Sequence, residues 1–272
     1  MLKPSHFVHP FAVRSAGNAQ ILQHAIEWAM DAGRIQIQKF RSRHLAMDTK
    51  TSVADVVTEV DKECEQYLIR EISAAYPTHS ILGEETGAHQ KESEWQWVVD
   101  PLDGTNNYSQ GLPIFAVSIG VQYRGVTQVG VVYVPYLDEL FTASRGDGAS
   151  WNGKAIHVSR KTDLAECVLG TGFPYDKATN PVNNLDNVQA IVPRVRGLRR
   201  MGAAAYDLCC VASGMLDGYW ELDLKPWDAC AGALIVEEAG GVVRPFRTDR
   251  NISIVAGSEK VVDQIFDLLA KS

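Results

Sequence analysis

Residues 97–108, WVVDPLDGTNNY, place two acids on either side of a sharp bend at the end of an apolar run. Trp97 to Val99 is apolar and rich in β-branched residues, which predicts the end of a buried strand, and we expect this strand to stop at Asp100. Pro101 cannot donate a ladder hydrogen bond and favours an extended backbone at the residue before it. Asp103-Gly104 then predicts a turn, because glycine tolerates backbone angles that other residues resist. Both carboxylates can therefore point into one crevice.

The oxygens of Asp100 and Asp103 suit a hard cation, Mg²⁺ before Zn²⁺. The N–H groups of Gly104 and Thr105 follow directly, and at the start of a helix or turn they would form an anion site beside the metal. A metal next to an anion pocket indicates phosphate chemistry. The alternative for this short motif is an Asx-turn with solvated carboxylates, so the other acids of the chain must decide.

The composition narrows the classes of function. The chain has 272 residues, of which 46% are hydrophobic, enough for a single domain, 1–272, whose halves of about 1–160 and 161–272 share an active-site cleft. A net charge of −7 without a long basic run argues against nucleic-acid binding as the main role. The five cysteines lack zinc spacing and predict buried, reduced thiols in a cytoplasmic protein. No apolar run approaches a membrane span, so we expect a soluble protein without membrane contact.

Two further acids lie close to the ends of expected elements. Asp61 falls in the first turn of a helix that we expect from the N-cap Thr58 to Pro77, where compensation of the helix dipole is the simpler role. Glu84 follows the short strand 80–82 by one glycine and could turn into the same crevice as Asp100. Adjacent acids on a loop are more commonly solvated surface, so both interpretations stay open here.

Asp228 carries the strongest argument for function. It lies in the first turn of a helix that starts at Pro226, is apolar on nearly every face and ends at Gly240. A carboxylate on such a buried end needs a cation partner.

The remaining pattern predicts alternating helices and strands. Helices are expected over 18–40, 200–215 and 259–269, with a loop and a helix within 176–196. Strands are expected over 115–123, 128–135, 140–143, 167–172, 217–222, 241–244 and 252–256, and Asn152-Gly153 predicts a hairpin turn. No Ser, Cys or His lies in a nucleophile motif, which favours direct attack by water over a covalent intermediate.

Three motifs now stand together: Gly83-Glu84-Glu85, the turn from Asp100 to Thr105, and Trp227-Asp228 followed by small residues. In this order and spacing they resemble the inositol monophosphatase family of Mg²⁺-dependent, lithium-sensitive phosphatases. The similarity runs from about Lys50 to Gly241. It implies an α/β fold of the layered α+β kind, an αβαβα sandwich of alternating helix and sheet layers. It also implies a homodimer and two or three Mg²⁺ ions as cofactors.

The resemblance assigns roles to single residues. The metal ligands would be Glu84, Asp100, Asp103, Asp228 and the carbonyl of Leu102. The catalytic set would be Asp61, Thr105 and Glu84, with Asp61 and Thr105 orienting and deprotonating the attacking water. Substrate and phosphate contacts would come from Gly104, Thr105, Gly202, Ala204, Glu221 and Asp228, with Lys50 near the site.

The expected reaction is the hydrolysis of a myo-inositol phosphate to myo-inositol and phosphate. A sugar bisphosphatase, a histidinol phosphatase or a nucleotide 3′-phosphatase on the same metal site is the alternative. Glu221 favours a polyol, and 106–108 does not match the Lys-Glu-Phe of the nucleotide branch. The chain departs from the family at 106–108, where Thr-Asn-Phe is usual, and at Ala203, where Thr or Ser is common. A second, regulatory binding role beside catalysis is the alternative from another class.

Overall fold

The computed structural model describes residues 16–42, 45–49 and 56–269. The α-helices within these ranges are α1 (Ala16–Lys39), α2 (Glu59–Ala75), α3 (Thr105–Ser109), α4 (Leu185–Ile191), α5 (Ala204–Ala212), α6 (Pro226–Glu238) and α7 (Glu259–Leu269). Short 3-10 turns cover Leu164–Glu166 and Val192–Arg194.

The strands form a larger sheet, a smaller sheet and a separate ribbon. In spatial order the larger sheet contains β10 (Lys154–Ala155), β9 (Gly148–Trp151), β8 (Glu139–Ser144), β7 (Val126–Val134), β6 (Ala116–Tyr123), β5 (Trp95–Asp103), β3 (Ser80–Gly83) and β4 (Gly87–His89). The smaller sheet contains β12 (Gly197–Arg199), β11 (Val168–Thr171), β13 (Gly218–Leu224), β15 (Ile252–Gly257) and β14 (Val242–Pro245). The ribbon pairs β1 (Met47–Thr49) with β2 (Val56–Thr58).

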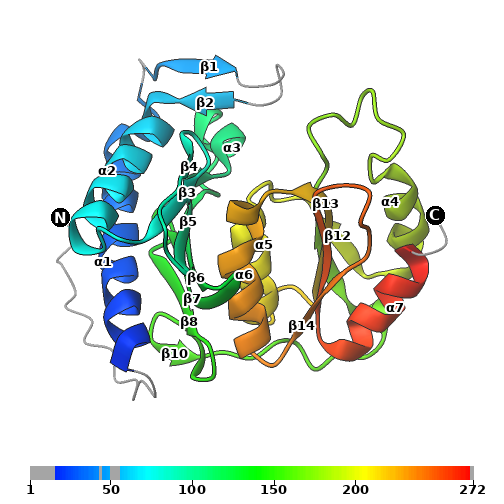
Figure 1. Cartoon of the computed structure of the whole chain (residues 1–272). Coiled ribbons are helices and arrows are strands. Elements are labelled where there is room, and N and C mark those ends of the chain that lie inside the picture. The colour runs from blue at the N-terminus through cyan, green and yellow to red at the C-terminus, as the bar shows by residue number, and fades with distance from the viewer. Residues whose placement is uncertain (1–15, 43–44, 50–55, 270–272) are drawn as a thin grey trace.

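Helix layers and sheet layers alternate across the molecule (Figure 1). Helices α1 and α2 cover the outer face of the larger sheet, α5 and α6 lie between the two sheets, and α4 and α7 cover the outer face of the smaller sheet. The predicted αβαβα sandwich is confirmed. Each sheet is buried on both faces, which requires strands with apolar or small residues at successive positions rather than a polar outer face.

Strand β6 shows how the sequence provides two buried faces. Val117, Ile119 and Val121 face the core that α1 and α2 complete. The alternate positions are small and lie against α6, because the hydroxyl of Ser118 donates to the carbonyl of Trp227 and a Cβ at Gly120 would overlap the sulfur of Cys230. Gly120 pairs with Gly130 of β7, which lies equally close to α6. Small residues on this face thus let the N-terminal end of α6 approach the sheet.

Most expected elements are present, with differences that have local causes. The helix expected over 200–215 begins at Ala204 and ends at Ala212, because Gly202 and Gly214 adopt left-handed backbone on either side of it, with φ of +82° and +74°. The hairpin at Asn152-Gly153 is confirmed, and both residues have positive φ. Strands β1, β2, β4 and β12 were not expected, since each is only three residues long.

All five cysteines are buried and none forms a disulfide, in agreement with their expected reduced state. Within the described residues no helix is both long enough and apolar enough to cross a membrane.

Gly130→Ala should destabilise the fold by about 1–3 kcal/mol, the usual cost of overpacking. The new Cβ would lie 2.7 Å from the carbonyl oxygen of Ala231, so β7 and α6 would have to separate. The free energy of unfolding in urea measures the effect. Val126→Thr is the control, since Val126 is 50% exposed on the same strand and the replacement keeps a β-branched side chain. Equal effects of the two substitutions would contradict close contact with α6.

Candidate active site

Strand β5 carries Asp100 and Asp103, the two acids of the 97–108 segment. The expectation that the strand stops at Asp100 is wrong, because it continues to Asp103. Asp100 pairs with Ser118 and Asp103 pairs with Ala116, so β5 advances one residue more than β6 over this stretch. The extra residue makes a bulge, which accommodates Pro101 because proline has no N–H for the ladder.

The two carboxylates at the bulge are buried and bound by backbone N–H groups. Asp100 is 2% exposed and Asp103 is 7% exposed. The Oδ1 of Asp100 accepts from the N–H of Leu102 at 2.9 Å, which is an Asx-turn, although the carboxylate is not solvated as that alternative assumed. The two oxygens of Asp103 accept from Ala204 N–H at 3.1 Å and Ala205 N–H at 2.9 Å. Asp103 therefore links the bulge to the start of α5, about 100 residues further along the chain.

Gly104 is held against the loop that precedes α5. Its φ is +90°, and a Cβ there would lie 2.9 Å from the carbonyl oxygen of Ile114 and 3.2 Å from the Cβ of Ala203, so only glycine fits. The side-chain amide of Asn107 donates to the carbonyls of Ile114 and Met201, both at 2.8 Å. These contacts bring Gly202 and Ala204 beside the start of α3, as the assigned substrate roles require.

Asp61 and Thr105 are in direct contact. The hydroxyl of Thr105 donates to Asp61 Oδ1 at 2.7 Å and also lies 3.0 Å from the carbonyl oxygen of Leu102. The Oδ2 of Asp61 accepts from the N–H of Thr58 at 2.8 Å and from its hydroxyl at 2.5 Å. Thr58 is the N-cap of α2, as the sequence predicted, and it forms a capping box with Asp61 that was not predicted. One carboxylate thus caps the helix with one oxygen and reaches Thr105 with the other.

Glu84 follows β3, which runs parallel to β5, so both strands deliver their acids to the same edge of the sheet. The Glu84 carboxylate lies close enough to change the pKa values of three other acids. After burial, the negative charge of Glu84 is the largest single cause that raises the pKa of Asp100, and it also raises the pKa values of Asp103 and Asp228.

Asp228 comes to the same place from the first turn of α6. Its Oδ2 accepts from the N–H of Lys225 at 2.7 Å, which fixes the carboxylate at the helix start. Burial raises its pKa well above the ordinary value, and the charges of Glu84, Asp103 and Glu221 raise it further.

Glu221 on β13 lies at the side of this cluster that the smaller sheet provides. A Cβ at Gly172 would overlap the Glu221 carboxylate, so the glycine at the end of β11 makes room for it. Burial raises the pKa of Glu221 to about 7, against the hydrogen bond from the Tyr219 hydroxyl and the positive charge of Arg200. The structure therefore brings Glu84, Asp100, Asp103, Asp228 and Glu221 into one electrostatically coupled group.

Comparison with known proteins shows the family of the chain. The chain matches the model of the inositol monophosphatase family over residues 18–267. The chain belongs to the inositol monophosphatase family.

Related proteins agree with this assignment. A protein named Nus factor SuhB from Pasteurella multocida is 42% identical over 252 residues, which cover 91% of this chain and 94% of that protein. The inositol monophosphatase structure from Anabaena has a TM-score of 0.85 and 36% identity, and the match covers 94% of this chain and 97% of that one. A structure described as inositol monophosphate-bound SaIMPase-II has a TM-score of 0.77 and 28% identity, with coverage of 93% and 94%.

The donor set of this family member fits a hard divalent cation in chemistry and charge. Among the described residues, Asp100, Asp103 and Asp228 form no ion pair, and each accepts a hydrogen bond from a backbone N–H group. Carboxylate and carbonyl oxygens are the ligands that Mg²⁺ prefers. Within the described ranges, however, no three His, Cys, Asp or Glu side chains have the geometry of a finished metal site. The site thus has the donors and the charge for Mg²⁺. Its carboxylates are oriented by hydrogen bonds from backbone N–H groups and do not form a finished coordination shell.

Two buried acids near the site were missed by the sequence prediction. Glu65 is 0% exposed on α2, and its signal in the sequence was its position one helical turn after Asp61. Asp207 is 1% exposed on α5, its Oδ1 has no hydrogen-bond partner among the described residues, and burial and the charge of Glu221 raise its pKa. Lys50, expected near the site, lies outside the described residues.

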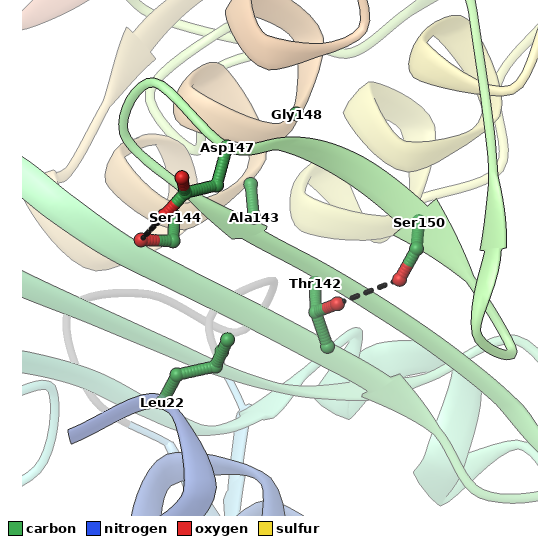
Figure 2. Close-up of a pocket in the computed structure, with 7 residues that line it drawn as sticks. All are labelled: Leu22, Thr142, Ala143, Ser144, Asp147, Gly148 and Ser150. Atoms are coloured by element: carbon green, nitrogen blue, oxygen red, sulfur yellow. Dashed lines mark hydrogen bonds between the residues drawn. The ribbon is translucent and has the colours of Figure 1, made fainter. Parts of the chain in front are cut away.

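A small cavity on the larger sheet contains none of the predicted site residues. Figure 2 shows that it lies between Leu22 of α1 and side chains of β8 and β9, with Thr142 bonded to Ser150 and Ser144 bonded to Asp147. Its volume of about 20 Å³ is room for one water molecule. The cavity is a packing feature that lies apart from the acid cluster.

Without Mg²⁺, the wild-type protein should lose stability relative to Asp103→Asn as the pH rises from about 5 to about 8. Burial raises the pKa of Asp103 from 3.8 to about 7, so the folded state prefers the neutral acid. The stability that this preference contributes is complete below the unfolded pKa of about 3.9 and is lost as the pH rises through the folded pKa. Urea denaturation of both proteins in EDTA measures the difference in the free energy of unfolding.

Millimolar Mg²⁺ should stabilise the wild type more at the upper end of this pH range than at the lower end, because it binds ionised carboxylates of the folded state. A difference between the two proteins that does not change with pH would contradict the raised pKa of Asp103. An absence of any Mg²⁺ effect near pH 8 would argue against the metal role.

Proposed function

We propose that this chain is a Mg²⁺-dependent phosphate monoester hydrolase whose preferred substrate is inositol monophosphate. The observation that carries the proposal is the hydrogen-bonded pair of Asp61 and Thr105 at the edge of five coupled carboxylates. Membership of the inositol monophosphatase family supports the reaction, and the inositol monophosphate bound to the related SaIMPase-II supports the substrate. Lithium sensitivity, a homodimer and a cytoplasmic location are part of the same proposal.

The carboxylates of Glu84, Asp100, Asp103 and Asp228 and the carbonyl of Leu102 would hold two or three Mg²⁺ ions. When bound, the ions lower the pKa of the attacking water and neutralise charge on the leaving oxygen. The backbone N–H groups bind one oxygen of Asp100, one oxygen of Asp228 and both oxygens of Asp103, and each carboxylate has further lone pairs for a cation.

Asp61 and Thr105 would move the proton of the attacking water. The Thr105 hydroxyl already donates to Asp61 Oδ1, so its oxygen can accept a proton from water as its own proton passes to the carboxylate. The two bonds from Thr58 hold Asp61 in the orientation that this transfer needs. Hydrolysis of a phosphate monoester is among the slowest uncatalysed reactions, so a positioned base alone, worth about 10²–10⁴-fold, is not enough and charge stabilisation must supply the rest.

The two ends of the substrate would meet different parts of the site. The N–H groups of Gly104 and Thr105 open α3 and would bind phosphate oxygens, since the first N–H groups of a helix have no partner within it. Gly202 and Ala204, from the loop and first turn of α5, and Glu221, from β13, would contact the alcohol. A carboxylate such as Glu221 accepts hydrogen bonds from hydroxyl groups, which favours a polyol phosphate.

Asp103→Asn should lower kcat/KM by about 100-fold or more, because it removes a charge that faces the reacting group. The fold should survive with a loss of about 1 kcal/mol, since an amide can accept only one of the bonds from Ala204 and Ala205. Phosphate release from a panel of inositol, sugar, histidinol and nucleotide phosphates measures the effect and ranks the substrates. Asp186→Asn, at an exposed position on α4, is the matched control. Unchanged turnover would refute the role of Asp103, and preference for another ester would correct the substrate.

Glu221→Gln should raise KM for inositol monophosphate about tenfold, the value of one hydrogen bond to a charged group, with a smaller change in kcat. The KM for p-nitrophenyl phosphate, which offers no hydroxyl groups, should stay the same. Steady-state kinetics with both substrates test this. An equal rise in KM for both would show that Glu221 acts on the site as a whole rather than on the polyol.

A second binding role is supported by the name Nus factor of a relative with 42% identity. Binding to another protein depends on the surface of the chain and not on catalytic turnover. It should therefore be retained in the Asp103→Asn protein. Affinity capture with that variant and with the wild type separates the two roles. Specific partners that both proteins retain would support binding that is independent of catalysis. Partners that the variant loses would contradict it.

A further inference from the structure

Glu65 is a buried carboxylate with a defined task that catalysis does not use. It is 0% exposed on α2. One oxygen accepts from the N–H of Glu85 at 2.8 Å and the other accepts from the N–H of Thr86 at 2.7 Å. Both donors belong to the turn that follows β3, directly after Glu84. A buried charge is stable only with strong partners, and here all the hydrogen bonds described for its carboxylate go to this turn.

Gly83 completes this contact from the other side. A Cβ at Gly83 would lie between 2.6 and 2.9 Å from the atoms of the Glu65 carboxylate. The absence of a side chain therefore lets the carboxylate lie directly under the backbone of the turn. Glu84 stands between the glycine that touches Glu65 and the two N–H groups that bind it, so its backbone is fixed on both sides.

Helix α2 presents Asp61 and Glu65 one turn apart, on the same face. Asp61 binds Thr105 and Glu65 binds the turn that carries Glu84. Helix α2 thus holds two parts of the site that follow different strands. A carboxylate can hold two N–H groups at once, whereas an amide can accept from only one of them and would place its NH₂ against the other.

We propose that Glu65 is a positioning residue that sets the place of the Glu84 carboxylate and thereby the Mg²⁺ affinity of the site. This inference rests on the proposed function. Glu65 does not touch the metal; it acts through the N–H groups of Glu85 and Thr86. Groups that orient a metal ligand in this way change metal affinity by about 10- to 100-fold when they are replaced.

The test is Glu65→Gln, which keeps the shape of the side chain and removes one of the two acceptors. Calorimetric titration with Mg²⁺ alone should show an affinity about tenfold weaker than that of the wild type. In turnover, the Mg²⁺ concentration for half-maximal rate should rise by the same factor, while KM for the phosphate ester at saturating Mg²⁺ stays unchanged. Circular dichroism and thermal melting in EDTA establish that the variant is folded at the titration temperature.

Glu238→Gln is the matched control. The two oxygens of Glu238 accept from the N–H groups of Gly146 and Gly148, each at 2.9 Å, so the same carboxylate-to-turn contact occurs away from the acid cluster. Its replacement should lower stability but leave Mg²⁺ affinity as in the wild type. A purely structural role for Glu65 would make the two variants alike.

Gly83→Ala provides a second route if Glu65→Gln does not fold. The new Cβ would displace the Glu65 carboxylate from the turn without removing its charge, and Mg²⁺ affinity should again fall. If the folded Glu65→Gln protein binds Mg²⁺ as tightly as the wild type, the inference is overturned and the proposed function still stands. The same holds for Gly83→Ala if that variant is measured instead. A wild type that binds no Mg²⁺ would overturn both.

Discussion

Repulsion between carboxylates that are buried or half-buried is the constraint on which the site depends. Glu84, Asp100, Asp103, Asp228 and Glu221 come from four segments, and negative charges within this group raise the pKa values of Asp100, Asp103 and Asp228. The described residues oppose this repulsion with backbone N–H groups, from Leu102, Ala204, Ala205 and Lys225. Hydrogen bonds to a charged group contribute about 1.5–3 kcal/mol each, so a few of them can hold such a cluster together in a folded protein.

The layers of the fold are what bring these N–H groups to the acids. Helices α5 and α6 lie between the two sheets (Figure 1). The first turn of α5 binds Asp103 at the bulge, and the first turn of α6 accepts a hydrogen bond from Ser118, which pairs with Asp100. Close approach of α6 depends on Gly120 and Gly130, since a Cβ on either would overlap the helix. The glycines that pack the helix and the acids that serve the site are therefore parts of one arrangement, in which packing decides where the Asp228 carboxylate lies.

Local patterns in the sequence predicted what local chemistry controls. The apolar run before Asp100, the Thr58 cap and the Pro226 helix start were read correctly, because each depends on neighbours within a few residues. The end of β5 was placed too early, since the proline that breaks a regular ladder is absorbed by a bulge whose register depends on β6. Glu65 was missed because its partners lie 20 and 21 residues away, and its position one helical turn after Asp61 is a signal that surface glutamates on a helix also show.

Asp61 shows why simple and functional interpretations of a residue need not compete. The sequence explains its place in the first turn of a helix by compensation of the helix dipole, and the structure shows that Asp61 also caps the helix. A carboxylate has two oxygens, however, and the cap uses Oδ2 while Oδ1 accepts from Thr105. The cap fixes the rotation of the side chain, and this fixed rotation aims the second oxygen at the Thr105 hydroxyl. The structural bond is thus the cause of the orientation on which the proposed proton transfer depends, so the stabilising role of Asp61 is part of its function.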